Sequence, residues 1–247
     1  MFKIVIPARN ASTRLPGKPL LDIAGKPMVV RVAEQAAKSG ASNIVIATDF
    51  EPIISVAEAH NFKAMMTRVD HASGTDRIAE VAQLLGWHDD EIVVNVQGDE
   101  PLIDPNLITQ VAQHLANSQD AVMATACHPI YDEASLLNPN IVKVVINSLG
   151  NALYFSRAPI PYPRDELHKN KIKAHRHIGI YAYRVGFLKK YAQLTVTELE
   201  KIECLEQLRV VYHSYKIGVV ITKNVPASGV DTQEDLDFVR SVFVSKG

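Results

Sequence analysis

Short apolar runs alternate with amphipathic stretches through the first half of the chain. The apolar runs predict strands at 2–6, 43–48, 63–67, 91–96 and 120–126. Apolar residues at helical spacing predict helices at 28–39, 52–60, 75–85 and 105–117. Strands that alternate with helices in this way are typical of a mostly parallel sheet covered by helices on both faces. We therefore expect an α/β fold.

The second half of the chain follows a different pattern. Two β-like runs at 141–146 and 152–156 flank a polar segment that predicts a hairpin turn, so antiparallel strands are expected to join the sheet. The irregular, charged stretch 161–176 is the best candidate for a mobile flap. The later elements are predicted to be a strand at 178–184, helices at 186–193 and 197–213, a strand at 216–222 and a helix at 233–244.

Size and charge narrow the class of protein. The 247 residues suffice for one large α/β domain, or for one domain with an appended lobe. With 26 basic and 27 acidic residues the net charge is -1, so no overall field attracts nucleic acid or an acidic membrane. No stretch approaches the roughly 20 apolar residues of a membrane helix, and the amino terminus leads into a strand rather than a signal core. We expect a soluble protein that is not exported.

The two cysteines agree with that expectation. Cys127 and Cys204 fall in apolar-patterned segments and share no metal-ligand spacing with each other or with histidine. Two cysteines are too few for a disulfide scaffold. Both are predicted to be buried, reduced thiols, which suits a cytoplasm.

Three cations follow the first predicted strand. Pro7, Pro16 and Gly17 break regular structure after the strand, and the same loop carries Arg9, Arg14 and Lys18. In an open α/β sheet such a loop lies at the carboxyl edge, where ligands bind. A cation about 4 Å from a phosphate oxygen gains roughly 4 kcal/mol of Coulomb energy at an effective dielectric near 20, before desolvation. The loop is therefore either a triphosphate site or a solvated basic loop.

Carboxylates follow two other strands. Asp99 comes after the buried run 93–96, and Asp231 follows the strand 216–222. Mg²⁺ prefers oxygen ligands and is usually held by one or two carboxylates together with substrate phosphates. Each acid also has a simpler interpretation, Asp99 as a turn or cap residue and Asp231 as support for a helix start. The capping-box pattern of Thr232 with Asp235 explains Thr232 better than it explains Asp231.

Further polar residues lie near predicted element ends. Ser73 with Asp76 has the spacing of a capping box, and the same helix start offers amides and hydroxyls to a ligand, with Arg77 able to reach a nucleotide. Asp49 is a strand-end acid that we interpret as mainly structural. His175 and His177 share a strand face without a third metal-type ligand, so zinc is not expected.

The helix predicted at 197–213 carries two polar residues beside its core stripe. Ile202, Leu205 and Leu208 form that stripe. Glu206 and Gln207 fall beside it, either as the rim of a cleft or as a solvated face, and the pattern alone favours the solvated face. The chain has no Ser-His-Asp signature, no GxxxxGK[ST] loop and no GxGxxG, which disfavours a P-loop NTPase or a dinucleotide oxidoreductase.

An ordered set of motifs, running nearly end to end, resembles the 3-deoxy-manno-octulosonate (Kdo) cytidylyltransferases, the CMP-Kdo synthetases of lipopolysaccharide assembly. The motifs are Ile6-Pro7-Ala8-Arg9, Ser12-Thr13-Arg14-Leu15-Pro16-Gly17-Lys18-Pro19, Ser73-Gly74-Thr75-Asp76-Arg77, Gln97-Gly98-Asp99-Glu100-Pro101, Tyr154-Phe155-Ser156-Arg157, Arg176-His177-Ile178-Gly179-Ile180-Tyr181, Leu205-Glu206-Gln207-Leu208-Arg209 and Gly229-Val230-Asp231-Thr232. The opening loop alone indicates only a sugar nucleotidyltransferase, whereas the ordered set is much more specific.

The resemblance implies a fold, an activity and a domain plan. The fold is a Rossmann-like nucleotidyltransferase fold with a mostly parallel central sheet and an antiparallel lobe for sugar binding and dimerisation. The activity is the Mg²⁺-dependent reaction of CTP with Kdo to give CMP-Kdo and pyrophosphate, carried out by a cytoplasmic homodimer. In this plan 1–247 is one domain, in which 1–127 mainly binds nucleotide, 128–215 mainly binds sugar and dimerises, and 216–247 returns to the main sheet.

The resemblance also implies a role for each matching residue. The triphosphate and departing pyrophosphate would be handled by Arg9, Arg14 and Lys18, with Ser12 in the same loop. Ser73 and Arg77 would lie on the nucleotide side, and Asp99 and Asp231 would hold Mg²⁺. The residues facing the sugar acid would be Gln97, Arg157, His177, Glu206 and Gln207.

Two departures and several rival functions accompany this interpretation. Asn10 stands where many relatives have an aromatic residue, and Tyr162 where many have Trp, which affects the loop edge and the sugar flap. The rivals are a cytidylyltransferase for sialic acid or 8-amino-Kdo, a transferase using a sugar 1-phosphate, and a nucleotide-binding protein without catalysis. No residue is an obvious strong base for the attacking hydroxyl, and the sequence does not identify the proton acceptor.

Overall fold

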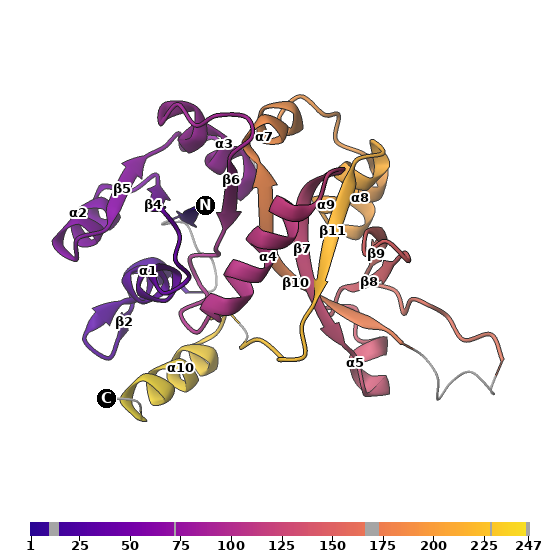
Figure 1. Cartoon of the computed structure of the whole chain (residues 1–247). Helices are drawn as coiled ribbons and strands as arrows, with labels where there is room; N and C mark the ends of the chain where they lie inside the picture. The colour runs from indigo at the N-terminus through magenta and orange to yellow at the C-terminus, as the bar shows by residue number, and fades with distance from the viewer. Residues whose placement is uncertain (10–14, 72, 166–172, 228, 246–247) are drawn as a thin grey trace.

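The computed structural model describes residues 1–9, 15–71, 73–165, 173–227 and 229–245. Within these ranges one sheet has nine strands, and a two-stranded hairpin stands apart from it (Figure 1). The strands of the sheet are β1 (Lys3–Ala8), β4 (Asn43–Thr48), β5 (Lys63–Met66), β6 (Ile92–Asn95), β7 (Ala121–Pro129), β8 (Lys143–Ile146), β9 (Ala152–Ser156), β10 (His175–Arg184) and β11 (Lys216–Ile221). The hairpin consists of β2 (Asp22–Ile23) and β3 (Lys26–Pro27).

Helices connect most of these strands. The α-helices are α1 (Met28–Ala37), α2 (Glu51–Ala59), α3 (Gly74–Leu84), α4 (Pro105–Asn117), α5 (Glu133–Leu137), α7 (Val185–Tyr191), α8 (Glu198–Glu203), α9 (Gln207–Tyr212) and α10 (Gln233–Ser245), and a 3₁₀ turn, η1, spans Lys18–Leu20. None of the helices in the described ranges has the length and apolarity needed to cross a bilayer.

The sheet is parallel through its centre and antiparallel where the lobe joins it. Its strand order is β11-β7-β10-β6-β1-β4-β5. The central strand β1 pairs in parallel with both β4 and β6, whereas β10 runs antiparallel to β6 and β7 and also pairs with β8. The predicted α/β fold, with a mostly parallel central sheet and an antiparallel addition, is confirmed.

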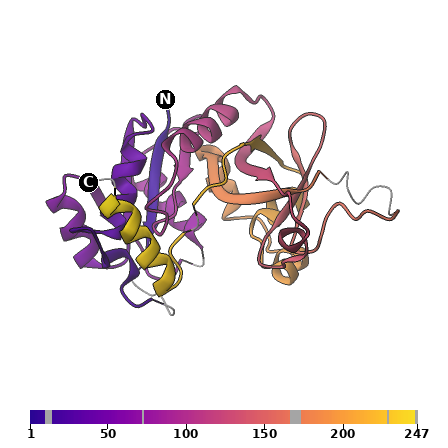
Figure 2. The same cartoon turned by 90° about the horizontal axis from the view of Figure 1, so that it is seen from below.

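The two faces of the sheet carry separate apolar cores. Ile4 and Ile6 of β1 pack into a core with α1, α2 and α4, while Val5 faces a second core with α3, α7 and α9. Successive strand residues point to opposite faces, so the sequence of a strand buried on both sides is an unbroken apolar run. In Figures 1 and 2 the lobe of β8, β9 and α5 lies at one end of the molecule and α10 at the other.

The helix predicted at 197–213 is two helices. Cys204 has a left-handed backbone with φ 51°, which ends α8, and α9 begins three residues later. Leu205 and Leu208 are buried as expected, but Ile202 is 76% exposed, because the break turns α8 away from the predicted stripe. Cys204 is exposed rather than buried, whereas Cys127 is buried as predicted. The break places the two residues after Leu205 at the start of a new helix.

Candidate active site

The carboxyl ends of β1 and β6 lie side by side. The strands are paired in parallel, and Val96 continues the pairing by donating its amide hydrogen to Val5 O at 3.1 Å. Gly98 then passes so close to β1 that a Cβ there would lie 2.6 Å from Pro7 O. Glu100 N donates to Gln97 O at 3.2 Å, which closes the turn that presents Asp99. Glycine is therefore required at 98 by backbone proximity.

We expect Gly98→Ala to reduce activity more than the same substitution at a glycine with open space around it. The added methyl group must push the Asp99 turn away from Pro7, and a displacement of about 1 Å costs on the order of 10²-fold in rate. The measurement is kcat/KM for pyrophosphate release. Gly179→Ala is the matched control, because a Cβ at 179 meets nothing within 4 Å. Equal activity of the two variants would contradict the role of Gly98.

Lys18 joins the two predicted metal-binding acids. Its Nζ donates to Asp99 Oδ2 at 2.7 Å and to Asp231 Oδ1 at 3.2 Å, and also to Val230 O at 2.8 Å. The Lys18 side chain is 15% exposed, and those of Asp99 and Asp231 are 34% and 46% exposed. Two carboxylates 132 positions apart in the sequence thus converge on one ammonium group.

Asp231 reaches this point because the segment after β11 runs against the Asp99 turn. Val230 N donates to Asp99 O at 2.8 Å, and Val230 is buried with Ile23 and Met28 under α10. The start of α10 is capped by Asp235, which accepts from the amides of Asp231 and Thr232. The capping role therefore falls to Thr232 and Asp235, as predicted, while the Asp231 carboxylate binds Lys18.

The chemistry of this acid pair suits a hard divalent cation. In the described part of the chain, no group of three or more His, Cys, Asp or Glu side chains is placed to hold a metal ion. Asp99 and Asp231 offer two carboxylates, the number that commonly holds Mg²⁺ when substrate phosphates complete its shell. Burial and the charge of Asp99 raise the pKa of the neighbouring Glu100 carboxyl to about 8, so Glu100 adds little further negative charge at neutral pH.

The residues expected on the nucleotide side have mixed placements. Ser73 caps α3, with its hydroxyl accepting from Asp76 N at 3.2 Å in a complete capping box. Arg77 is fully buried, and its guanidinium donates to Thr67 Oγ1 and, at 2.8 Å, to Asp49 Oδ2. Arg77 therefore ties the start of α3 to the ends of β4 and β5, and direct contact with a nucleotide stays a prediction.

Arg9 is an exposed residue at the end of β1. Its charge acts to lower the pKa of the Glu206 carboxyl, although burial, the largest influence, leaves that pKa raised overall. Arg9 therefore lies near enough to Glu206 to affect it electrostatically. The predicted roles of Ser12 and Arg14 fall outside the described residues.

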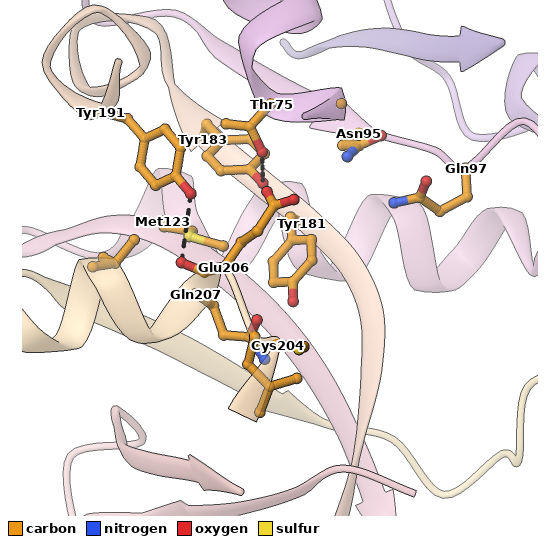
Figure 3. Close-up of a pocket in the computed structure, with 13 residues that line it drawn as sticks. Thr75, Asn95, Gln97, Met123, Tyr181, Tyr183, Tyr191, Cys204, Glu206 and Gln207 are labelled. Carbon is orange, nitrogen blue, oxygen red and sulfur yellow. Dashed lines mark hydrogen bonds between the residues drawn. The ribbon is translucent and has the colours of Figure 1, made fainter. Parts of the chain in front are cut away.

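A pocket of about 270 Å³ opens beside the Asp99 turn. Three of the five residues predicted to face the sugar line it, namely Gln97, Glu206 and Gln207. In Figure 3 the ring of Tyr181 lies between the side chains of Gln97 and Gln207. The interpretation of Gln207 as part of a solvated face is wrong, because Gln207 is 5% exposed and lines this cavity. Glu206 also lines the cavity but keeps its exposure to solvent.

Sequence reasoning missed most of the pocket wall. Asn95, Tyr183 and Tyr191 line it together with the start of α3. Tyr183 Oη lies 3.4 Å from Thr75 Oγ1, and Tyr191 Oη donates to Glu206 O at 3.4 Å. Burial raises the pKa of both phenols, so both are neutral. Tyr181 and Tyr183 lie two positions apart on β10, and this spacing was an available signal because alternate strand residues share a face.

Arg157 and His177 do not line this pocket. Arg157 Nε donates to Glu203 O at 2.7 Å and its backbone amide donates to Glu203 Oε2 at 2.8 Å, which fastens the end of β9 to α8. The centroid of the His177 ring lies 5.0 Å from that of the Phe155 ring and 5.5 Å from that of the Tyr181 ring. His177 Nε2 lies 3.0 Å from Thr125 Oγ1. In this structure both residues therefore support the pocket wall, and sugar contact stays a prediction.

The environment of His177 predicts a pH-dependent stability. Burial lowers the pKa of its imidazole to about 3, well below its ordinary value near 6.5. Between these values the unfolded chain takes up a proton that the folded chain does not, so stability falls as the pH drops below about 6.5. The loss is up to about 1.4 kcal/mol per pH unit.

We expect His177→Gln to reduce the loss of folding stability at acidic pH. Urea unfolding at pH 7 and pH 5 measures the difference in free energy of unfolding between the two pH values. The exposed His88, replaced as His88→Gln, is the control and should keep the wild-type difference. An unchanged difference in His177→Gln would show that another group carries the acid sensitivity.

Comparisons with known proteins agree with this geometry. Residues 3–217 match the sequence profile of the cytidylyltransferase family. A solved CMP:2-keto-3-deoxy-manno-octonic acid synthetase complexed with CTP is 42% identical, with a TM-score of 0.92 and full coverage of both chains. A cytidylyltransferase from Leptospira borgpetersenii shares the fold at 18% identity and a TM-score of 0.64, covering 99% of this chain and 87% of that one.

Proposed function

The chain belongs to the cytidylyltransferase family, and on this premise we propose that it transfers CMP from CTP to the anomeric hydroxyl of Kdo, giving CMP-Kdo and pyrophosphate for lipopolysaccharide assembly. The observation that carries the proposal is the meeting of Lys18, Asp99 and Asp231 next to a polar pocket. Gln97 lines the pocket only two positions before Asp99. A sugar in the pocket and a triphosphate at the acid pair would therefore be neighbours.

The proposed cofactor is Mg²⁺, held by Asp99 and Asp231. Support comes from the convergence of both carboxylates on the Lys18 ammonium, which brings the two acids to one point. When bound, Mg²⁺ supplies charge neutralisation at the phosphates and orients them for in-line displacement. Glu100, with its raised pKa, leaves the acid pair as the main negative charge at neutral pH.

The chain's own residues have separable tasks in this reaction. The sugar's anomeric oxygen forms a bond to the α-phosphorus while the bond from phosphorus to pyrophosphate breaks, and the hydroxyl proton passes to solvent or substrate. Lys18 and Arg9 stabilise the negative charge that develops on pyrophosphate. Gln97, Gln207 and the tyrosines that line the pocket hold the sugar close to the nucleotide. The two bound substrates then react from a fixed orientation, which lowers the entropic part of the barrier.

Pyrophosphate release tests the proposal. The assay combines each of the four nucleoside triphosphates with Kdo, 8-amino-Kdo and sialic acid. We expect turnover with CTP and Kdo, at least about 100-fold above other nucleotides. No turnover with any pair would favour a nucleotide-binding protein without catalysis, and a preference for sialic acid or 8-amino-Kdo would transfer the assignment to that sugar.

A cytoplasmic homodimer completes the proposal. The lobe carries four large apolar side chains that are more than half exposed, namely Tyr131, Leu137, Leu149 and Leu153. They come from α5 and its approach, the turn between β8 and β9, and β9 itself. A second copy of the chain would cover them. Sedimentation equilibrium should give twice the monomer mass, and Leu153→Glu should lower it.

A further inference from the structure

A small core under α10 joins the two halves of the proposed metal site. Ile23 of the hairpin and Val230 are both fully buried in it. Val230 directly precedes Asp231, and its carbonyl oxygen accepts a hydrogen bond from Lys18 Nζ at 2.8 Å. Leu21, three positions after Lys18, packs against the same core. The packing of this core therefore sets where Asp231 lies relative to Lys18.

The hairpin that supplies Ile23 turns through two residues with a left-handed backbone. Ala24 has φ 52° and Gly25 has φ 83°. Glycine adopts this conformation freely. For alanine it costs on the order of 1–3 kcal/mol and persists only where the surrounding structure holds it. Ala24 therefore needs a partner outside the turn.

Arg31 of α1 is that partner. Its Nε donates to Ile23 O at 2.9 Å and its Nη2 donates to Ala24 O at 2.5 Å, so one edge of the guanidinium binds two consecutive carbonyls. Its Nη1 donates to Glu34 Oε2 at 3.1 Å, which balances the charge. The Arg31 side chain is only 15% exposed. A lysine ammonium has no planar fork and cannot bind the turn in this way.

The same guanidinium also contacts α10. Its Cζ lies 4.8 Å from the centroid of the Phe243 ring, which is the geometry of a cation–π contact. A second link comes from Arg240 of α10, whose Nε donates to Asp22 O at 2.9 Å. In agreement with these links, α10 packs against β2 (Figure 1). The helix that begins just after Asp231 is thus attached to the hairpin at two points.

We propose that Arg31 is a positioning residue for the nucleotide and metal site. It fixes the hairpin and α10 against each other, and through Ile23 and Val230 it holds Asp231 at the distance from Asp99 that binding of one cation by both acids requires. The inference rests on the proposed function, since it assumes a divalent cation at the acid pair. Functional groups must be held to within about 0.5 Å by the residues behind them, and Arg31 supplies that support here.

Hydrogen exchange of the protein without ligands is the first measurement. Val230 N donates to Asp99 O at 2.8 Å, so exchange in the peptide 229–236 reports how firmly the Asp231 segment is docked. In Arg31→Met, which keeps an apolar stem but has no donor, we expect exchange there to rise about tenfold. Arg31→Lys should give a similar rise, because it keeps the charge without the planar fork.

Metal affinity is the second measurement. With CTP present, the Mn²⁺ dissociation constant from electron paramagnetic resonance should rise about tenfold in Arg31→Met, as is usual for residues behind metal ligands. An affinity does not depend on the fraction of protein that is folded. The KM for Kdo should stay close to the wild-type value, because the residues that line the pocket lie between positions 74 and 210, outside the hairpin, α1 and α10.

Arg184→Met is the matched control. The guanidinium of Arg184 also binds three backbone carbonyls, those of Leu115, Ser118 and Ala121. Arg184 pairs with the start of β6, at the edge of the sheet opposite the Asp99 turn. This variant should lower the melting temperature, while exchange in the peptide 229–236 and the Mn²⁺ dissociation constant keep their wild-type values.

Two results overturn the inference. One is wild-type exchange and wild-type Mn²⁺ affinity in Arg31→Met, and the other is an equal change in both arginine variants. If Arg31→Met does not fold, Phe243→Leu decides, because it removes the cation–π contact but keeps an apolar side chain. Its exchange and dissociation constant should also rise, and unchanged values would overturn the inference.

Failure of the proposed function would look different. No sugar acid would then release pyrophosphate from CTP in the wild-type protein. Exchange of the peptide 229–236 would still respond to Arg31→Met, because that measurement needs neither sugar nor metal.

Discussion

Replacing Lys18 by alanine is expected to lower kcat by on the order of 10²- to 10³-fold, the usual cost of removing one donor that stabilises a transition state. The ammonium lies 2.7 Å from Asp99 and 3.2 Å from Asp231, so it is already fixed at the point where phosphates and a metal would meet. Charge moves onto pyrophosphate as the bond to the α-phosphorus breaks, and a prepositioned cation needs little reorganisation to stabilise it.

Steady-state pyrophosphate release measures this effect. Lys26→Ala is the matched control, because Lys26 lies on the nearby β3 and pairs with Glu34 rather than with the acid pair. Its activity should stay within about twofold of the wild type. Turnover near the wild-type rate in Lys18→Ala would remove Lys18 from the mechanism, and an equal loss in both lysine variants would indicate a general effect of surface charge.

Asp99→Asn and Asp231→Asn are each expected to shift the Mg²⁺ dependence of turnover strongly. Loss of a ligand should raise the Mg²⁺ concentration for half-maximal rate by on the order of 10- to 100-fold or more, since even residues behind the ligands contribute that much. The amide keeps the size of the carboxylate and one oxygen, so the change isolates the charge. The two shifts should be similar if both carboxylates hold one ion.

Direct metal binding provides the second readout. Titration of Mn²⁺ into the protein with CTP, followed by electron paramagnetic resonance, should show weaker binding in both variants. Asp104→Asn is the control, because Asp104 follows the same strand but caps α4 by accepting from Asn106 N at 2.9 Å, a role that asparagine fills equally well. Unchanged metal dependence in the two site variants would make Asp99 and Asp231 caps.

Local sequence patterns were sufficient to predict most of the helices and strands. The strand 43–48 and the helix 105–117 were predicted to the residue, because an unbroken apolar run and a proline-led amphipathic stretch are strong local signals. The topology rule for parallel strands also placed Asp99 at the ligand edge. The family predicted from the motifs is confirmed by the match over residues 3–217.

The errors came from residues whose state depends on distant partners. No local sequence signal indicates the left-handed backbone of Cys204, so α8 and α9 were predicted as one helix. Gln207 looks solvated in sequence, yet it is 5% exposed because its helix starts at the pocket. The sequence pattern indicates a cation at Arg77 that is free to reach a nucleotide, but Asp49, which lies 28 positions earlier at the end of β4, neutralises it inside the protein. Pairings over such separations cannot be read from spacing.

The attachment of Asp231 has a consequence for the heat sensitivity of the site. The segment that holds it is bound to the Asp99 turn through Val230 N, through the Lys18 ammonium and through the small core under α10. That core is separate from the two cores that flank the sheet. Local opening of α10 would therefore withdraw one of the two acids while the sheet stays folded, so activity should be lost at a lower temperature than the sheet.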